Sequence, residues 1–166
     1  GQPYELPVRP SPNLPNSQAI ALYPSLCLFE ATIMSVGRGT DKPFQALGHP
    51  NAGFGQLVFT PRIKVGEDSN PRHKGKPCYG IDYREKGLPK GQISLAPLID
   101  LYRKAESLGL QLINQRQLFD LLAGTKTLRS QLASGLSEAE IRASWEADLE
   151  AYRRLRAKYL LYEDAR

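Results

Sequence analysis

The chain has 166 residues, a formal charge of +5 and two cysteines, a length that fits one domain with its own core. No apolar run is long enough to span a membrane, so we expect no membrane span. Acidic and basic residues alternate closely through most of the chain, which is typical of a solvated surface and predicts no nucleic-acid partner.

Residues 1–24 are rich in proline. Proline fixes φ and removes a backbone donor, so this segment is predicted to be extended rather than helical. The apolar run at 25–34 fits either a short helix or a strand. The chain begins with Gly1 rather than methionine and carries no signal peptide, so we expect a further segment upstream.

Two strands are predicted in the middle of the chain. Residues 56–65 alternate and carry β-branched side chains, with an interruption at Pro61. Residues 78–85 form the second strand, and residues 66–77 between them are a polar loop. The glycine-containing segment at 35–44 is predicted to be a loop as well.

Helical signals fill the chain from Ser94 onward. Ser94 and Asn114 are predicted to cap two helices, which end at Gly109 and Gly124. A short helix ends at Gly135, and a long last helix covers residues 137–162. Its apolar face is predicted to be core and comprises Ile141, Trp145, Leu149, Tyr152, Leu155 and Tyr159.

Ser137 and Glu140 have the spacing of a capping box, which predicts where the last helix begins. Strands early and helices late indicate an α+β fold, with a small mixed or antiparallel sheet first and helices packed from the C-terminal half. We expect residues 1–166 to act as a single domain.

An arginine between two glycines is the most informative motif. Gly37 and Gly39 flank Arg38, and Ser35 and Thr40 lie close by. The glycines let the backbone approach a ligand, and the guanidinium can hold a carboxylate or phosphate with two parallel hydrogen bonds. The pattern is neither a P-loop nor a dinucleotide fingerprint, so no nucleotide cofactor is expected.

Glu30 allows two interpretations that residue chemistry leaves open. It is the only acid between Glu5 and Asp41, and its neighbours are apolar. Desolvation there would suit a general acid, with Asp41 as the nearest second carboxylate. Alternatively, Glu30 forms an ion pair with Arg38 and fixes the loop, which is the interpretation we favour.

The histidines and cysteines give weaker signals. His49 follows the arginine loop closely, so we include it among the candidate binding residues, whereas His73 has the surroundings of a solvated charge. Cys27 and Cys78 form no CxxC pair, so no zinc or other metal is expected. A single disulfide is an alternative for an exported protein, but we favour buried free thiols.

The sequence resembles a known bacterial family over nearly its whole length. The matching motifs include "SPNLPN", "YPSLCLFEATIMSVGRGTDKPFQALGHP", "FTP", "CYGID" and the stretch from "LFDLLAG" to "KYLLY". They look like the C-terminal part of the exo-β-N-acetylmuramidases, long called a domain of unknown function, in the variant typical of Bacteroidetes. Such enzymes remove terminal N-acetylmuramic acid from peptidoglycan fragments.

The resemblance implies a two-part enzyme with a Rossmann-like N-terminal half and an active site between the halves. It places the catalytic glutamates in that N-terminal half, around a Gly-Pro-Glu-His-Gly motif that this chain does not contain. The chain is therefore expected to be the C-terminal, substrate-binding half, to need the upstream domain of the same polypeptide, and to be inactive alone. The substrate implies a periplasmic or secreted location.

N-acetylmuramic acid carries a lactyl carboxylate that N-acetylglucosamine lacks. Arg38 is a suitable group to bind that carboxylate, with Ser35 and Thr40 orienting the sugar and Glu30 holding Arg38. A second interpretation keeps catalysis within this chain through Glu30 and Asp41. A third treats the chain as a non-catalytic module that binds cell-wall sugars or a protein.

Overall fold

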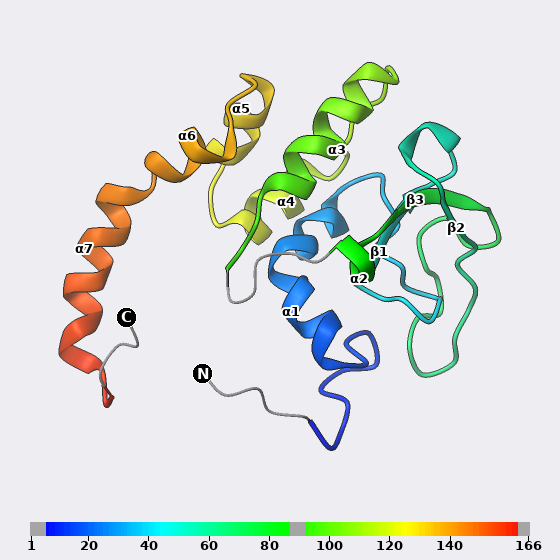
Figure 1. Ribbon diagram of the computed structural model, residues 1–166, viewed down its shortest axis with the longest axis horizontal. Coiled ribbons are helices and arrows are strands. Elements are labelled where there is room, and N and C mark those ends of the chain that lie inside the picture. Colours follow the sequence, from blue (N-terminus) through cyan, green and yellow to red (C-terminus); the bar gives the residue numbers. More distant parts are fainter. Residues whose placement is uncertain (1–5, 87–91, 163–166) are drawn as a thin grey trace. The chain divides into compact units, whose positions relative to one another are not determined.

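The computed structural model describes residues 6–86 and 92–162. The backbone forms two compact units, Gly1–Lys126 and Thr127–Arg166. The first unit holds the sheet and helices α1–α4, and the second holds helices α5–α7 (Figure 1). A small antiparallel sheet early in the chain and helices after it confirm the predicted α+β class.

Helix α1 (Ser17–Leu26) corrects the prediction of an extended segment up to residue 24. Five prolines fall within residues 1–15, but residues 16–23 contain none, so this stretch can propagate a helix once it is capped. The Asn16 side chain provides the cap by accepting a hydrogen bond from the Ala19 amide over 2.8 Å. Pro24 lies in the last turn, where a single backbone hydrogen bond is lost. The prediction for residues 1–5 lies outside the described residues.

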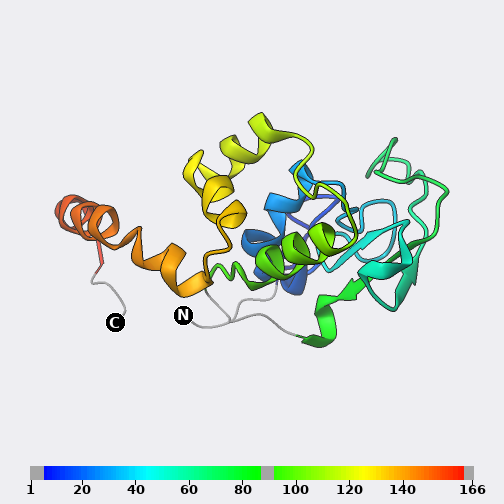
Figure 2. The ribbon, with the colours of Figure 1, turned by 90° about the horizontal axis from the view of Figure 1, so that it is seen from above.

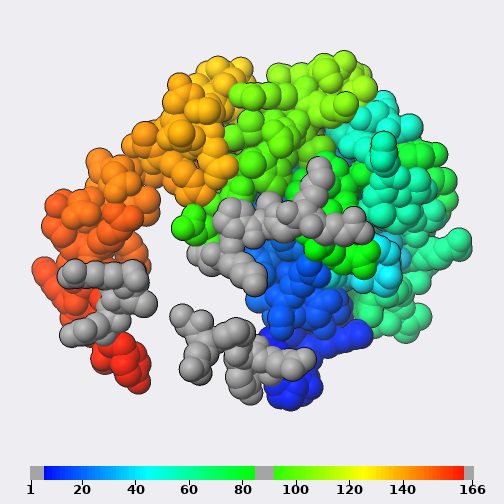
Figure 3. Space-filling model, viewed as in Figure 1, coloured from blue at the N-terminus to red at the C-terminus, as the bar shows by residue number. Residues whose placement is uncertain are grey.

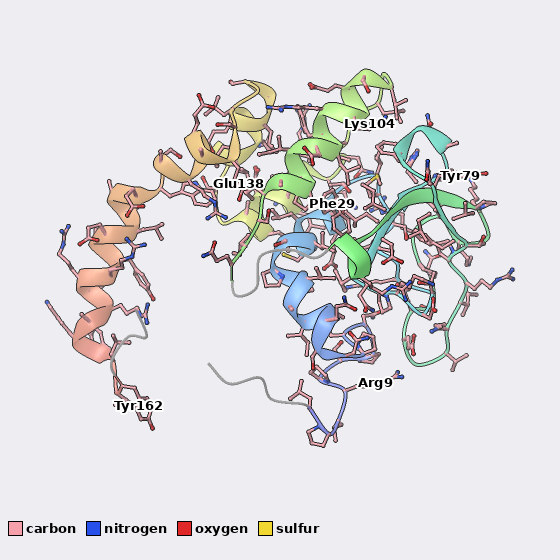
Figure 4. The ribbon with its side chains drawn as sticks, viewed as in Figure 1. Arg9, Phe29, Tyr79, Lys104, Glu138 and Tyr162 are labelled. Carbon is pink, nitrogen blue, oxygen red and sulfur yellow. The ribbon has the colours of Figure 1, made fainter. Side chains whose placement is uncertain are left out.

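The sequence predicted either a short helix or a strand for the apolar run at 25–34, and the part that follows α1 is helical. It forms a 3-10 helix, η1 (Cys27–Ala31), in which Phe29 is fully buried (Figure 4). The Gln115 amide donates to the Ala31 carbonyl over 3.1 Å, and the Ile33 amide donates to the Leu112 carbonyl over 2.9 Å. These bonds hold η1 and the residues after it against the segment that connects α3 (Ala96–Ser107) to α4 (Arg116–Ala123).

The sheet has three strands in the order β1-β3-β2, with both pairings antiparallel. Strand β2 (Leu57–Phe59) ends before Pro61, as predicted. Strand β3 (Cys78–Asp82) gives way to the short helix α2 (Tyr83–Lys86), so the second predicted strand is three residues too long. Strand β1 (Ala46–His49) was not predicted, because its four residues show no clear alternation of polar and apolar side chains.

Two glycines let the strands come together at the centre of the sheet. Gly48 of β1 pairs with Gly80 of β3. A side chain at Gly80 would overlap the Leu47 carbonyl, and one at Gly48 would meet the ring of Phe59. The Phe59 ring therefore packs against the backbone of Gly48, in space that the side chain of any larger residue at position 48 would occupy.

Helices α3 (Ala96–Ser107) and α4 (Arg116–Ala123) complete the first unit. The Ser94 hydroxyl accepts a hydrogen bond from the first amide of α3 over 3.2 Å, although Leu95 is the residue at the cap position. Asn114 does not cap α4, which begins after Gln115. Gly124 ends α4 in a left-handed conformation, as predicted.

The core of the first unit lies between these helices, η1 and the sheet. Both ribbon views show α1 and α3 beside each other, with the strands of the same unit next to them (Figures 1 and 2). The largest side chains that are almost completely buried here are those of Phe29, Phe44, Phe119, Leu26, Met34, Leu47, Leu98, Leu101 and Leu112.

The second unit contains α5 (Thr127–Ala133), α6 (Glu138–Ala143) and α7 (Glu146–Arg156). The capping box is confirmed: the Ser137 hydroxyl accepts from the Glu140 amide, and the Glu140 carboxylate accepts from the Ser137 amide.

The long last helix that the sequence predicted is broken between α6 and α7. The Ser144 hydroxyl donates to the Ile141 carbonyl over 2.6 Å and accepts from the Gln131 side chain over 2.9 Å. These side-chain bonds compete with continued helix, so the axis changes at this residue.

The predicted core face of the last helix is largely exposed in the structure. Ile141 is buried, but Leu149, Tyr152, Leu155 and Tyr159 are each at least 40% exposed. The apolar spacing correctly indicated an amphipathic helix. It gave no information about which surface, if any, covers that face.

Candidate functional site

The loop that follows η1 is held by its own hydroxyl groups. The Ser35 hydroxyl accepts a hydrogen bond from the Gly37 amide over 3.3 Å. The Thr40 hydroxyl donates to the Gly37 carbonyl over 2.6 Å and accepts from the Lys42 amide over 3.0 Å. Gly37 has a φ of +78°, and a side chain there would collide with the Lys42 carbonyl. The loop is thus fixed in shape around Arg38.

Backbone pairing joins this loop to the sheet. The Ser35 amide donates to the Gly48 carbonyl over 2.7 Å, and the Gly48 amide donates back over 3.0 Å. On the opposite side, the Phe44 ring makes an edge-on contact with Tyr23 of α1, with 4.8 Å between centroids. Figure 3 shows the blue residues of α1 and the cyan residues of this region side by side on the surface.

Arg38 forms the ion pair with Glu30 that the sequence suggested. Arg38 Nη2 lies 3.0 Å from Glu30 Oε2, and both side chains are partly exposed. The guanidinium also lies over the Phe44 ring, with Cζ 5.3 Å from the ring centre. Arg38 Nε is buried and donates to no acceptor among the described residues. About a third of the Arg38 side chain is exposed, and this part of it can meet a ligand.

These residues form one wall of a cleft of about 570 Å³. The other wall comes from residues 68–76, for which the sequence predicted only a polar loop. The cleft is lined by Glu30, Met34, Ser35, Val36, Arg38, Asp68, Asn70, Pro71, Arg72, His73, Lys74 and Lys76. Four of these side chains are cationic and two are acidic, so the cleft favours an anionic ligand.

The structure places the sequence-derived candidates in different positions relative to the cleft. Glu30, Ser35 and Arg38 line it. Gly37, Gly39 and Thr40 are not among its lining residues, and they shape the loop that carries Arg38.

His49 lies at the end of β1 and is also not a lining residue of the cleft. Its Nδ1 accepts a hydrogen bond from the Asn51 amide over 3.0 Å. Burial and the neighbouring His73 together lower the pKa of His49.

His73 is not the solvated charge that its neighbours in the sequence suggested. Its side chain is half-buried, its Nε2 donates to the Ile33 carbonyl over 2.6 Å, and its ring meets His49 edge-on at 5.0 Å. Burial is the main cause that lowers its pKa, with smaller contributions from Arg72 and Lys76. The backbone of His73 has a φ of +61°. No local pattern signals this contact, because Ile33 lies 40 residues away.

Asp41 does not accompany Glu30 in the cleft. Its exposed carboxylate pairs with Lys42 over 2.8 Å, and the hydrogen bond from Lys42 is the main cause that lowers its pKa. Asp68 is the second acid that lines the cleft, and its Oδ1 accepts from the Asn70 amide over 2.9 Å. Catalysis by Glu30 together with Asp41 therefore has no shared site in this structure.

Within residues 6–86 and 92–162, no three histidine, cysteine or acidic side chains gather as metal ligands would. In the same residues, no helix has both the length and the apolar character needed to cross a membrane.

The first unit is thus an α+β domain with a cationic cleft built around a fixed arginine. Comparison with known proteins assigns the chain to a family. Residues 21–162 match the family described as exo-beta-N-acetylmuramidase NamZ, C-terminal, and the chain belongs to this family of glycoside hydrolase domains. The family predicted from the sequence motifs is thereby confirmed.

Individual relatives agree with the family assignment. The chain is 29% identical over 178 residues to the peptidoglycan beta-N-acetylmuramidase NamZ of Bacillus subtilis strain 168. That alignment covers 93% of this chain and 40% of the relative. A crystal structure of a DUF1343 family protein from Bacteroides fragilis NCTC 9343 matches with a TM-score of 0.81 and 42% identity. It covers 98% of this chain and 46% of that protein.

A second DUF1343 family protein of the same strain shares the fold, with a TM-score of 0.64 at 18% identity. In all three comparisons, the chain spans less than half of the length of the protein that it matches.

Proposed function

We propose that this chain is the substrate-binding C-terminal half of an exo-acting glycoside hydrolase that removes terminal N-acetylmuramic acid from peptidoglycan fragments. The catalytic acids belong to an upstream Rossmann-like half of the same polypeptide. The 166 residues act together as the C-terminal domain, and they are inactive alone. The enzyme works in the periplasm or outside the cell, where peptidoglycan is found.

The position of Arg38 in the cleft is the observation on which the proposal rests. It is a guanidinium in a cationic cleft, fixed by Glu30 and Phe44, with a buried Nε that has no acceptor among the described residues. A carboxylate is the ligand group that matches the planar guanidinium, whose side chain remains partly exposed. The lactyl group of N-acetylmuramic acid supplies a carboxylate, whereas N-acetylglucosamine supplies none. Arg38 therefore selects muramic acid.

The neighbouring hydroxyls have a supporting role. Ser35 is among the lining residues but is only 1% exposed, and its hydroxyl accepts from the Gly37 amide. Thr40 uses both of its hydrogen-bonding functions within the loop, so both hydroxyls hold the loop that orients Arg38 toward the sugar. The family relationship supports the sugar class, because the Bacillus subtilis relative bears the name of a peptidoglycan beta-N-acetylmuramidase. The chain contains no Gly-Pro-Glu-His-Gly sequence, which supports the dependence on an upstream half.

Binding of two sugars tests the substrate assignment. The chain is titrated with N-acetylmuramic acid and with N-acetylglucosamine, and backbone amide shifts are followed by NMR. We expect Arg38→Ala to weaken muramic acid binding by roughly tenfold or more, since a hydrogen bond to a charged group is lost. Binding of N-acetylglucosamine should not change. An unchanged preference for muramic acid in this variant would refute the role of Arg38.

Hydrolysis tests the dependence on an upstream half. Release of a chromogenic aglycone from N-acetylmuramic acid is measured for the chain alone and for the polypeptide that includes the preceding half. We expect release only from the longer polypeptide. Release by the chain alone, abolished by Glu30→Gln, would place catalysis within these residues. Sugar binding without hydrolysis in the longer polypeptide would favour a non-catalytic cell-wall binding module.

A further inference from the structure

Arg72 is the second arginine that lines the cleft, and it differs from Arg38 in having no counter-charge. Its side chain is half-buried, and the structure records no hydrogen bond or ion pair for it among residues 6–86 and 92–162. Burial lowers the pKa of its guanidinium. A partly desolvated charge without a partner is unfavourable unless a bound anion compensates it.

Among the described residues, neither acid that lines the cleft forms an ion pair with Arg72. Glu30 pairs with Arg38 over 3.0 Å, and Asp68 accepts from the Asn70 amide. Lys74 and Lys76 add positive charge to the same wall, and both are exposed. The uncompensated charge of the cleft is therefore concentrated at Arg72 and its lysine neighbours.

The loop that carries Arg72 is held firmly on both sides of it. His73 donates to the Ile33 carbonyl over 2.6 Å, and the Gly75 amide donates to the Pro61 carbonyl over 2.8 Å. The Lys74 amide donates to the Pro71 carbonyl over 3.1 Å. Arg72 is thus presented from a fixed backbone rather than from a freely moving loop.

The loops of the two arginines are in direct contact. A side chain built at Gly39 would meet the ring of Pro71, so these two residues are closely packed. Gly39 follows Arg38 in the chain, and Pro71 precedes Arg72. In addition, the Arg62 amide donates to the Gly39 carbonyl over 2.9 Å. The two guanidinium groups therefore project into one cleft from adjoining loops whose backbones are packed together.

We propose that Arg72 is a second carboxylate-binding residue, which binds the lactyl carboxylate of N-acetylmuramic acid together with Arg38. This inference rests on the proposed function of the cleft. Arg38, already paired with Glu30, gives directed hydrogen bonds from a fixed orientation. Arg72 supplies the positive charge that is still uncompensated. A neutral sugar would leave this charge desolvated, so the pair also penalises ligands that lack the carboxylate.

The experiment compares three ligands: N-acetylmuramic acid, its lactyl methyl ester and N-acetylglucosamine. Dissociation constants are measured by NMR titration for the wild-type chain and for Arg72→Gln, Arg38→Ala and the double variant. Arg62→Gln is the matched control, since Arg62 is exposed and is not a lining residue of the cleft. Arg72→Lys retains the charge without the planar fork and serves if the glutamine variant does not fold.

We expect Arg72→Gln to weaken N-acetylmuramic acid binding by roughly tenfold or more and to leave the two neutral ligands unchanged. Arg72→Lys should lie between the wild type and Arg72→Gln, and Arg62→Gln should behave as wild type. In the double variant, the losses should not add, because both residues hold the same carboxylate. The melting temperature of Arg72→Gln should not fall, since no internal ion pair is broken.

Other results overturn the inference in distinguishable ways. If Arg38→Ala weakens muramic acid binding and Arg72→Gln does not, Arg72 has no such role and the proposed function remains. If Arg72→Gln weakens all three ligands equally, or lowers the melting temperature, its role is structural. If the wild-type chain binds the three ligands equally, the proposed function fails and the role of Arg72 fails with it.

Discussion

Arg38 and Glu30 are joined by an ion pair of 3.0 Å between Nη2 and Oε2 at the wall of the cleft. The Phe44 ring lies beneath the guanidinium, with its centre 5.3 Å from Cζ. These two contacts set the orientation of Arg38 before any ligand arrives. Ordering a side chain in advance removes part of the entropy cost of binding.

Replacing Glu30 by glutamine and by alanine separates its charge from its positioning of Arg38. Glutamine retains an acceptor for Arg38, whereas alanine retains none. Both variants remove a negative charge from the cleft, so the comparison isolates the positioning effect. We expect Glu30→Ala to bind N-acetylmuramic acid about two- to tenfold more weakly than Glu30→Gln, by calorimetry or NMR titration.

The same pair of variants tests the alternative role of Glu30 as a general acid. In the longer polypeptide, Glu30→Gln should retain most of the hydrolysis if Glu30 only positions Arg38. A loss of roughly a hundredfold or more in kcat would instead assign proton transfer to this carboxyl group. Equal binding by the two variants would show that Glu30 does not position Arg38.

Gly39 is the residue at which the two loops of the cleft meet. Its φ is +76°, and a side chain would collide with the Arg62 carbonyl and with Pro71. We expect Gly39→Ala to destabilise the fold by at least about 1 kcal/mol more than backbone strain alone, and to weaken sugar binding by shifting Arg38 and Arg72 apart. Urea unfolding measures the first effect and NMR titration the second.

Gly66 provides the matched control, because its φ of +78° is almost the same and no atom lies within 4 Å of a side chain built there. Gly66→Ala therefore includes the strain of a left-handed residue without the collision. Equal loss of stability in the two variants would mean that the contact between the loops contributes nothing.

The features that sequence alone predicted correctly are those set by nearby residues. The capping box of Ser137 and Glu140, the helix end at Gly124 and the pairing of Glu30 with Arg38 all involve residues within eight positions of each other. Each follows from local hydrogen bonding, electrostatics or backbone sterics, so the pattern carries the information.

The features that sequence missed depend on distant contacts or on exceptions to composition. Strand β1 exists because β3 pairs with it from 30 to 36 residues away. The second wall of the cleft forms because His73 bonds to Ile33 across 40 residues. Proline-rich composition concealed α1, because the prolines avoid its first turns. No local pattern predicts the burial of Arg72. That Arg72 is half-buried whereas Lys74 is exposed can be seen only in the folded structure.

The two cysteines should react slowly with thiol reagents in the folded chain. Burial raises the pKa of Cys78 to about 11, and burial followed by the charge of Glu30 raises that of Cys27. Cys78 is buried, Cys27 is partly buried, and both are free thiols. Near pH 8, about one Cys78 in a thousand is a thiolate.

The rate of reaction with a chromogenic disulfide reagent measures the reactivity of the two thiols directly. The native chain should release the chromophore much more slowly than the chain in guanidinium chloride, which should release two equivalents, one for each cysteine. Rapid release from the native chain at the same pH would show that the thiols are more accessible than the structure indicates. The single variants Cys27→Ser and Cys78→Ala assign the two rates.

His49 and His73 should make the fold less stable as the pH falls below about 6.5. Their rings meet edge-on at 5.0 Å, and burial is the main cause that lowers the pKa of each. The unfolded chain therefore binds protons at these residues before the folded chain does, starting near the usual histidine pKa of about 6.5. The stability that they contribute is present above this value and is lost as the pH falls through the lower folded values.

Proton NMR of the imidazole rings and urea unfolding between about pH 5 and pH 7 test this expectation. Both histidines should titrate below the usual value, and His73→Gln should raise the pKa of His49, because a nearby positive charge is removed. The variant should also flatten the dependence of stability on pH. Asp41 and Asp82, whose pKa values are lowered by hydrogen bonds from Lys42 and Arg84 respectively, act only at lower pH. A histidine that titrates at or above its usual value in the wild-type chain would contradict the close packing of the two rings.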